Sequence, residues 1–215
     1  MEVSIIIAVH NAERYIGRAV RSALDQKFDK KAFEVIVVND GSTDNTDKIL
    51  DYYKKKIKII NLKKKKGLAF ARNEGIRSSN GRFIVCLDAD DYIHTDLIYL
   101  ESTFLYLNPQ WDAVSCDYSI VNEHEEHIKR VDGDEKPIAC GVMFRVERLI
   151  DIGLYDPEFE YNEEKDLRIK FENKNYIVKN IQLPLYRYRQ HANNLSKNKA
   201  IVKKYNKKLI EKHNL

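Results

Sequence analysis

A run of five apolar residues, 83–87, is followed at once by three carboxylates, those of Asp88, Asp90 and Asp91. Five consecutive apolar residues predict a strand that is buried on both faces, as in a parallel sheet covered by helices. Acidic side chains at the end of such a strand need a compensating cation. Asp88 and Asp90 are two residues apart, which suits a hard divalent ion with oxygen ligands. Acids also serve as turn residues and helix caps, so the neighbouring motifs must show whether these carboxylates bind an ion.

The composition is that of a globular protein with a sizeable core. The chain has 215 residues, of which 43% are hydrophobic and 33% charged, which is enough for one large domain or two small ones. Three cysteines, Cys86, Cys116 and Cys140, lie in apolar runs without metal-binding spacing. They predict buried free thiols in a reducing compartment. Because no apolar stretch resembles a signal peptide or a membrane span, we expect a cytoplasmic protein.

Lysines gather in two parts of the chain, at residues 54–66 and 197–212, although the net charge is only +4. Such runs are usually solvated faces, and they can also attract an anionic partner such as phospholipid or nucleic acid. A base-reading module would also need aromatic stacking platforms or a recognition helix beside the charge. The sequence shows neither, so we expect no nucleic-acid partner.

The first 90 residues alternate apolar strands with amphipathic helices. Strands are expected at residues 3–9, 33–38, 57–62 and 83–87, with a helix after each of the first three. This alternation predicts an α/β fold with a mostly parallel sheet and right-handed crossovers. In such sheets ligands bind beyond the carboxyl ends of the strands. Three polar clusters should therefore converge on one crevice, namely His10 with Asn11, Asp40 with Gly41 and Ser42, and the acids from Asp88 to Asp91.

The pattern changes after residue 92. Residues 113–121 and 128–131 alternate enough to predict a more antiparallel and partly exposed pair of strands. Short strands are expected at 141–144 and 185–189, and a helix should open near residue 163. No repeat or low-complexity linker separates the two halves. We therefore interpret residues 1–92 and 93–195 as halves of one composite domain, followed by a basic tail at 196–215.

Six short motifs follow one another along residues 2–195. They are residues 3–12, residues 37–44 (VVNDGSTD), residues 67–75 (GLAFARNEG), residues 87–91 (LDADD), residues 163–167 (EEKDL) and residues 186–191 (YRYRQH). The ordered set resembles the family 2 glycosyltransferases of the GT-A fold. The resemblance implies a Rossmann-like nucleotide-binding half fused to a smaller mixed acceptor-side half. It also implies an inverting transfer of a sugar from a nucleotide diphosphate donor, by preference UDP, to a glycan or lipid-linked acceptor.

The same resemblance implies roles for particular residues. Asp40 would accept a hydrogen bond from a base N–H, with the backbone near Ala8 and His10 framing the ring. Asp90 would bind a Mn²⁺ or Mg²⁺ ion directly, Asp88 would bind the ribose or a metal-bound water, and His191 would complete the metal shell. Arg72 is either near the donor or a surface or packing arginine. The implied substrate-binding set is Ala8, His10, Asn11, Asp40, Gly41, Ser42, Arg72, Asp88, Ala89 and Asp90.

An inverting displacement also needs a base that takes the proton of the acceptor hydroxyl. The family places this carboxylate in a Glu-Asp pair at the start of a helix, where this chain has Glu163 and Glu164. The resemblance implies Glu164 as the base. Because Glu replaces Asp in the pair, Glu163 and Asp166 stay open as alternatives. Acids also favour any helix N-terminus, whatever the chemistry.

Two further questions stay open at the level of the sequence. Apolar residues at 201, 202, 205, 209 and 210 predict an amphipathic helix in the tail. This helix can pack on the body, pair with a second copy, or attach to the anionic inner face of the cell membrane. The missing Gly-x-Gly-x-x-Gly after the first strand excludes a nicotinamide dehydrogenase. A degenerate nucleotide-sugar binding module remains the alternative to an enzyme, because the position of the base departs from the family pattern.

Overall fold

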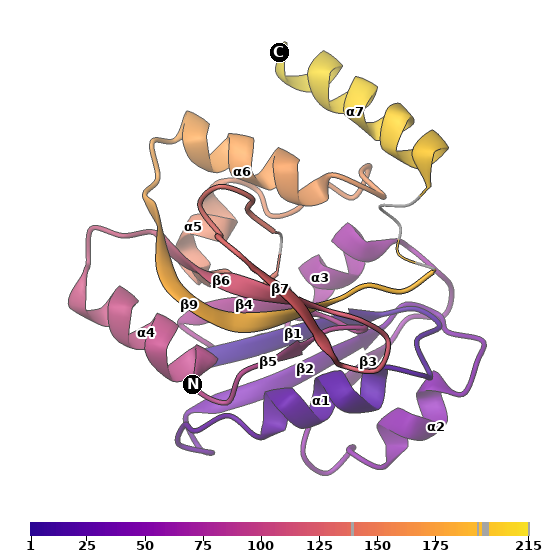
Figure 1. Cartoon of the computed structure of the whole chain (residues 1–215). Coiled ribbons are helices and arrows are strands. Elements are labelled where there is room, and N and C mark those ends of the chain that lie inside the picture. The colour runs from indigo at the N-terminus through magenta and orange to yellow at the C-terminus, as the bar shows by residue number, and fades with distance from the viewer. Residues whose placement is uncertain (139, 193, 195–197, 215) are drawn as a thin grey trace.

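The computed structural model describes residues 1–138, 140–192, 194 and 198–214, and its strands form one sheet (Figure 1). The strands are β1 (Val3–Val9), β2 (Phe33–Asn39), β3 (Lys58–Asn61), β4 (Phe83–Asp88), β5 (Tyr92–Ile93), β6 (Ala113–Val121), β7 (His127–Val131), β8 (Met143–Arg145) and β9 (Val178–Arg189). They lie in the order β3-β2-β1-β4-β8-β6-β9-β5, with β7 paired to β6. Since β4 of the first half pairs with β8 of the second, the sheet is continuous across the halves.

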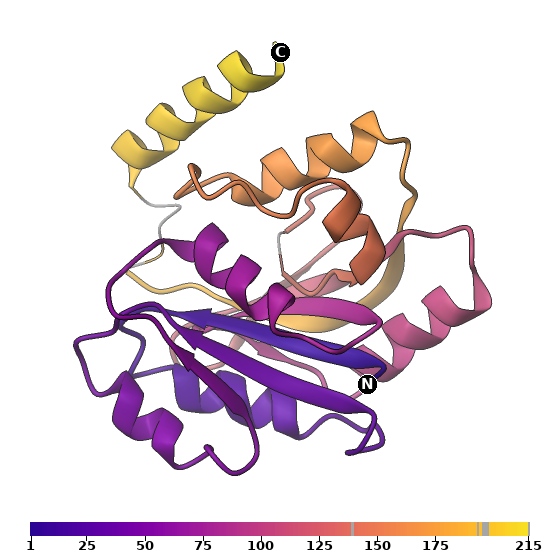
Figure 2. The same ribbon diagram turned by 180° about the vertical axis from the view of Figure 1, so that it is seen from behind.

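The helices are α1 (Ile16–Leu24), α2 (Thr46–Asp51), α3 (Leu68–Arg77), α4 (Leu97–Leu107), α5 (Val146–Asp151), α6 (Glu163–Asn173) and α7 (Lys199–His213). Helices α1 and α2 cover one face of the sheet, and α3, α5 and α6 lie on the other (Figures 1 and 2). Helix α7 lies beyond α6, away from the sheet (Figures 1 and 2). The helices on opposite faces explain why the central strands are apolar on both sides.

The first half has the parallel arrangement that the sequence predicts. Strand β1 pairs in parallel with β2 on one side and β4 on the other. Val9 lies opposite Asn39 and Ala8 lies opposite Asp88, so the three strands end at the same edge. This register brings the polar residues after each strand to one place, as expected for ligand sites in α/β sheets.

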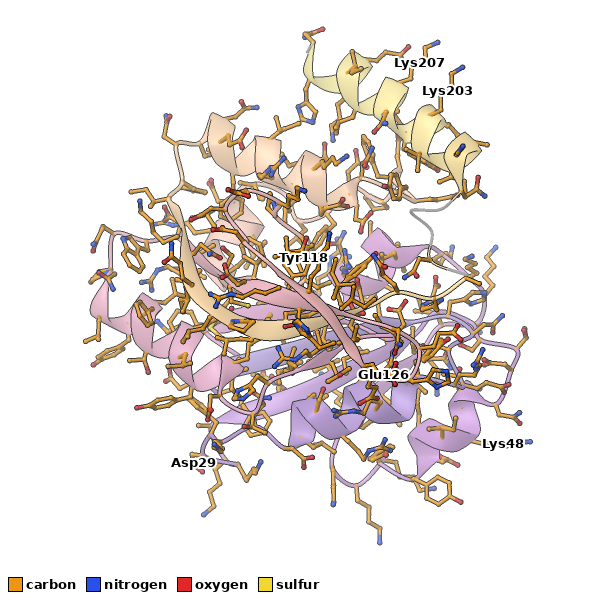
Figure 3. The ribbon with its side chains drawn as sticks, in the orientation of Figure 1. Asp29, Lys48, Tyr118, Glu126, Lys203 and Lys207 are labelled. Carbon is orange, nitrogen blue, oxygen red and sulfur yellow. The ribbon has the colours of Figure 1, made fainter. Side chains whose placement is uncertain are left out.

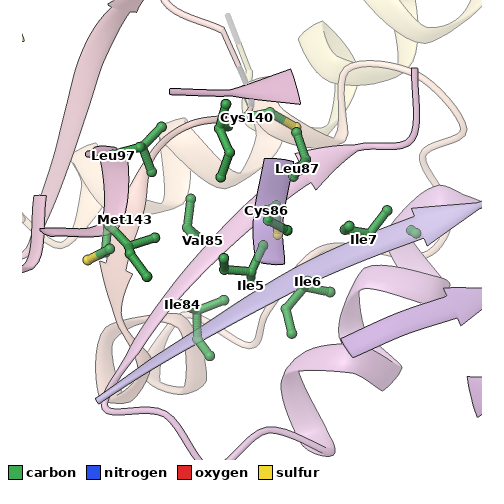
Figure 4. Packing of buried hydrophobic residues seen from close by; sticks show 14 of the residues in the cluster. Ile5, Ile6, Ile7, Ile84, Val85, Cys86, Leu87, Leu97, Cys140 and Met143 are labelled. Carbon is green, nitrogen blue, oxygen red and sulfur yellow. The ribbon is translucent and has the colours of Figure 1, made fainter. Parts of the chain in front are cut away.

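The main core lies between this sheet and its helices (Figure 4). Ile5 and Ile7 of β1 and Ile84 of β4 are fully buried. Gly75 allows α3 to approach β1 closely, because an added Cβ would lie 2.4 Å from Ile6 Cγ2. Cys86, Cys116 and Cys140 are buried free thiols, as the sequence predicts.

The second half is mixed, and one of its strands is longer than predicted. Strand β6 pairs antiparallel with β7 and β8 and parallel with β9. The prediction covered only residues 185–189 of β9, which extends back to Val178. The earlier part is mostly exposed and contains Pro184, where the β6–β9 register shifts opposite Asp117. Partly exposed strands that contain proline lack the apolar pattern that identifies buried strands.

The tail forms helix α7, which packs on the body with one of its faces. Tyr205 and Leu209 are buried against Phe159 in a small second core, whereas Ile210 is 51% exposed. Asn198 caps the helix, since its side chain accepts hydrogen bonds from the backbone of Ala200 and Ile201. In the part of the chain that the structure describes, no helix has the length and apolarity needed to cross a membrane.

One buried carboxyl group lies on α4 and does not belong to the acids at the end of β4. Glu101 of α4 is 0% exposed, and no described residue gives its two oxygens a hydrogen bond of normal geometry. Burial raises the pKa of Glu101 well above its ordinary value, although the nearby Cys116 thiol opposes the rise. The folded protein therefore holds the Glu101 proton to a higher pH than the unfolded chain does.

This burial makes the stability depend on pH. The unfolded chain loses the Glu101 proton near the ordinary pKa, whereas the folded chain keeps it until its own raised pKa. Between these two values the free energy of unfolding should fall as pH rises, by about 1.4 kcal/mol for each pH unit. Glu101→Gln, which cannot ionise, should therefore exceed the wild type in stability at about pH 8, with the difference disappearing at about pH 4. Urea unfolding between about pH 4 and about pH 8 measures the free energy of unfolding of both proteins, with exposed Glu172→Gln as control. Parallel stability curves for Glu101→Gln and wild type would contradict the assignment.

Candidate functional site

Three acids gather where β4 ends. Ligand oxygens of Asp88, Asp90 and Asp91 lie within 4.8 Å of one another. Asp88 and Asp90 are partly exposed, while Asp91 is buried. Carboxylate oxygens are the ligands that Mg²⁺ and Mn²⁺ prefer, so the cluster has the right chemistry for a divalent ion.

Asp91 is the most deeply buried of the three and links β4 to β9. Its Oδ2 accepts a hydrogen bond from the Tyr186 hydroxyl at 2.7 Å, and its Oδ1 accepts one from the Arg189 backbone N–H at 2.7 Å. Burial raises the pKa of Asp91 well above its ordinary value, and the charges of Asp90 and Asp88 add to the rise. Asp91 therefore fixes the far strand against the cluster.

His191 comes to the same place from the end of β9. Its Nε2 lies 2.7 Å from Asp90 Oδ2, although the two residues are 101 positions apart. The imidazole is 7% exposed, and it stacks on Tyr15 with ring centroids 4.9 Å apart. The pairing of β9 with β5 and β6 positions the histidine. The residues predicted to hold a metal thus lie together, and they come from both halves of the chain.

Arg72 lies behind the cluster on α3 and is not a surface residue. Its side chain is 2% exposed. One terminal nitrogen lies 2.7 Å from Asp88 Oδ1, and the other lies 2.7 Å from Glu163 Oε1. The first nitrogen is also 3.2 Å from Cys140 Sγ. The guanidinium therefore connects the strand-end acids with the first turn of α6.

The three candidate bases have different surroundings. Glu163 is 4% exposed and paired with Arg72; burial raises its pKa to about 7, against the opposing charge of Arg72. Asp166 is fully buried, and its Oδ1 lies 2.5 Å from Lys212 Nζ and 2.8 Å from His213 Nε2, both on α7. Glu164 is only half-buried, and no hydrogen bond or ion pair from a described residue engages its carboxylate.

Asp40 lies at the end of β2, and its carboxylate binds backbone groups. The two oxygens accept hydrogen bonds from the N–H groups of Lys66 and Gly67, at 2.6 and 2.8 Å. The Asp40 carbonyl oxygen accepts a hydrogen bond from His10 Nδ1 at 2.7 Å. Gly67 has φ 100°, a conformation that favours glycine, and immediately precedes α3. Asp40 thus joins the ends of β1 and β2 to the start of the helix that carries Arg72.

The remaining predicted residues hold the two neighbouring loops together. The Asn11 backbone N–H donates to Ser42 Oγ at 3.0 Å, and Asn11 Oδ1 accepts from the Thr43 N–H at 2.7 Å. Gly41 has φ 63°, and an added Cβ would lie 2.7 Å from the backbone of Lys64. Ala8 and Ala89 are each 8% exposed at the ends of β1 and β4.

Four further residues shape the site, although the sequence analysis gave none of them a binding or catalytic role. They are Asp91, Tyr186, Arg189 and Tyr15. Arg189 donates from Nε to the Asp90 carbonyl oxygen at 2.8 Å, and its guanidinium lies over the Tyr15 ring. The position of Asp91 as the third acid at the end of the strand was a usable signal for it. No such signal existed for Tyr15, because a tyrosine at helical spacing is usually a core residue.

Comparison with known proteins identifies the family of this chain. A family model described as Glycosyl transferase family 2 matches residues 4–148. EpsH of Bacillus subtilis (strain 168), which carries a glycosyltransferase name, is 30% identical over 97% of this chain and 65% of EpsH. This chain therefore spans about two thirds of that relative's length.

Solved structures share the fold at lower identity. S. aureus TarS (residues 1–349) in complex with UDP-GlcNAc has a TM-score of 0.78 and 22% identity, covering 90% of this chain and 60% of TarS. The mannosyltransferase PcManGT from Pyrobaculum calidifontis, in complex with GDP-Man and Mn²⁺, has a TM-score of 0.72 and 17% identity, covering 90% of this chain and 58% of PcManGT. These likenesses confirm the GT-A type of α/β fold. Together with the family match, they show that the chain belongs to glycosyl transferase family 2.

Proposed function

We propose that this chain transfers a sugar from a UDP-sugar donor to a hydroxyl group of a glycan or lipid-linked acceptor, with inversion. The observation that carries the proposal is the meeting of Asp88, Asp90 and His191 at the carboxyl edge of the sheet. Acids at a strand end, completed by a histidine from the other half, suit a charged diphosphate that binds through a cation.

The donor base would lie at the ends of β1 and β2. Asp40 uses one lone pair of each oxygen for the backbone of Lys66 and Gly67. A carboxylate has about four such sites, so Asp40 can also accept from a base N–H. The TarS complex contains UDP-GlcNAc and the PcManGT complex contains GDP-Man. We favour UDP for this chain because the TarS structure is the more similar of the two.

The residues of the cluster fit a divalent ion. Asp90 and His191 would bind Mn²⁺ or Mg²⁺, with Asp88 beside them. The ion would supply Lewis-acid stabilisation of the leaving diphosphate. Arg72 would hold Asp88 in place, because its guanidinium is buried and fixed on its other side by Glu163.

Glu164 is the base in this proposal. Glu163 is held by Arg72, and Asp166 is held by Lys212 and His213. Glu164 stands on the same turn and is partly exposed to solvent. It can therefore take a proton from an acceptor hydroxyl that approaches from outside. A degenerate binding module is not favoured, because a carboxylate remains available at the position where the family has its base.

The metal assignment is tested with His191→Ala. This variant should bind UDP at least about tenfold more weakly in the presence of Mn²⁺, because it removes a group that contacts the cluster. In EDTA the wild type and the variant should bind UDP equally weakly. Titration calorimetry measures both, with His94→Ala as control, because His94 is 42% exposed on its side chain and lies outside the cluster. Unchanged Mn²⁺-dependent affinity in His191→Ala would contradict the shared metal site.

The base assignment is tested with three amide variants. Glu164→Gln should lower kcat by about 10²- to 10⁴-fold, the usual contribution of a general base, with UDP affinity unchanged. Thermal-shift screening of nucleotide sugars with Mn²⁺ would select the donor, and UDP release with a panel of glycan acceptors would give kcat. Exposed Glu172→Gln, at the far end of α6, is the matched control. Full activity in Glu164→Gln combined with loss in Glu163→Gln or Asp166→Asn would move the base to that residue.

The outward face of α7 fits a peripheral contact with an anionic membrane. Lys203 and Lys207 point away from the body (Figure 3), and Ile210 is 51% exposed beside them. Lysines with an exposed aliphatic residue are typical of helices that bind anionic lipid surfaces. This arrangement would bring the site close to lipid-linked acceptors.

Vesicle sedimentation tests the contact. Wild type should sediment with vesicles of phosphatidylglycerol and phosphatidylcholine, and the double variant Lys203→Glu/Lys207→Glu should not, because it reverses the charge of the outward face. Lys55→Glu/Lys56→Glu makes the same charge change on exposed residues elsewhere and should still sediment. Negligible sedimentation of the wild type would reject membrane contact, and gel filtration would then show whether a second copy covers the face.

A further inference from the structure

Helix α7 holds the segment that leads into α6 by contacts along its length. Lys212 lies 2.8 Å from Asp156 Oδ2, and Lys208 Nζ lies 2.8 Å from Glu158 Oε2. Asn206 accepts a hydrogen bond from Asn162 Nδ2 at 2.8 Å. Both views of the ribbon show α7 next to the start of α6 (Figures 1 and 2). The residues held by α7 therefore begin before α6 and end in its first turn.

A small apolar core supports these polar contacts. Phe159 is 1% exposed and packs on Tyr205 of α7, with ring centroids 6.1 Å apart. Leu209 completes this cluster, which is separate from the main core. Since two of its three buried members lie on α7, undocking of this helix would expose Phe159. The conformation of residues 156–162 thus depends on α7 more than on the sheet.

Asn162 is the point at which this dependence reaches α6. It is fully buried, and its backbone is left-handed, with φ 66° and ψ 16°. A non-glycine residue in this conformation carries a strain that the surroundings must compensate. The only hydrogen bond of the Asn162 side chain among the described residues is the one to Asn206. Asn206 therefore helps to fix where the helix begins.

The first turn of α6 carries the residues that meet the site. Glu163 follows Asn162 directly and pairs with Arg72, which in turn pairs with Asp88. Asp166, on the same turn, is paired with Lys212 and His213 of α7. The turn is thus held from one side by Arg72 of α3 and from the other by α7, with Glu164 between the two attachments.

We propose that Asn206, together with Lys212, is a positioning residue for the catalytic turn of α6, so that sugar transfer requires α7 to be docked. The inference rests on the proposed function, because it concerns the placement of Glu164. Asn206 touches no reacting atom in this scheme and acts through Asn162. Loss of its contact should leave donor binding intact, since Asp40 and the β4 acids do not touch α7, and should lower the rate of transfer.

The test compares Asn206→Ala with Asn206→Asp, which keeps an oxygen that can accept from Asn162. Asn206→Ala should lower kcat by about 10- to 100-fold, as a small misplacement of a catalytic group does. The KM for the UDP-sugar that thermal-shift screening selects and the affinity for UDP should stay unchanged. Asn206→Asp should keep most of the wild-type kcat. Glu211→Gln, an exposed change on the same helix, should match the wild type. In hydrogen exchange, residues 157–166 should lose protection in Asn206→Ala alone.

A second variant covers a failure of Asn206→Ala to fold. Asn162→Gly removes the same hydrogen bond while its backbone accepts the left-handed conformation, and it should lower kcat in the same way. If Asn206→Ala and Asn162→Gly both match the wild type in kcat and in exchange protection, the inference is overturned. A wild type that binds UDP and releases none from any donor would overturn the proposed function instead, and the exchange experiment would still decide whether Asn206 holds the turn.

Discussion

The site depends on the buried guanidinium of Arg72. This cation is nearly inaccessible to water, so it needs anionic partners, and it finds them 2.7 Å away in Asp88 and Glu163. Removing one partner of such a buried pair typically costs about 3–5 kcal/mol, because the remaining charge is left without compensation. Asp88 ends a strand of the first half, and Glu163 begins a helix of the second. The Arg72 side chain therefore links the packing of the two halves to the placement of the acids.

Other contacts extend the same principle around the sheet edge. Asp91 fixes β9 through Tyr186 and the Arg189 backbone, and this places His191 against Asp90. The like charges at the end of β4 would repel one another without these donors. Each donor comes from a segment about a hundred residues later in the chain. The cluster is consequently stable only when the second half is folded against the first.

Some of this arrangement could be predicted from local pattern. Parallel strands with apolar residues on both faces place their carboxyl ends at one edge, so the meeting of His10, Asp40 and Asp88 followed from the strand spacing alone. The role of Asp166 could not be predicted in the same way. Its position in a turn of acids suggested catalysis, whereas its actual partners, Lys212 and His213, lie more than forty residues away. Such a partner is decided by helix packing, and no short-range pattern encodes it.

The sequence by itself determined the alternation of strands and helices, the acids at the end of β4 and the family, because these depend on residue order and local spacing. Only the tertiary structure decided which carboxylates are held and which remains accessible. The distinction between Glu163, Glu164 and Asp166 arises because α3 and α7 approach the same turn from opposite sides, with Arg72 on one and Lys212 on the other. Charges on distant segments set these pairings through burial and distance, and both quantities exist only once the chain has folded.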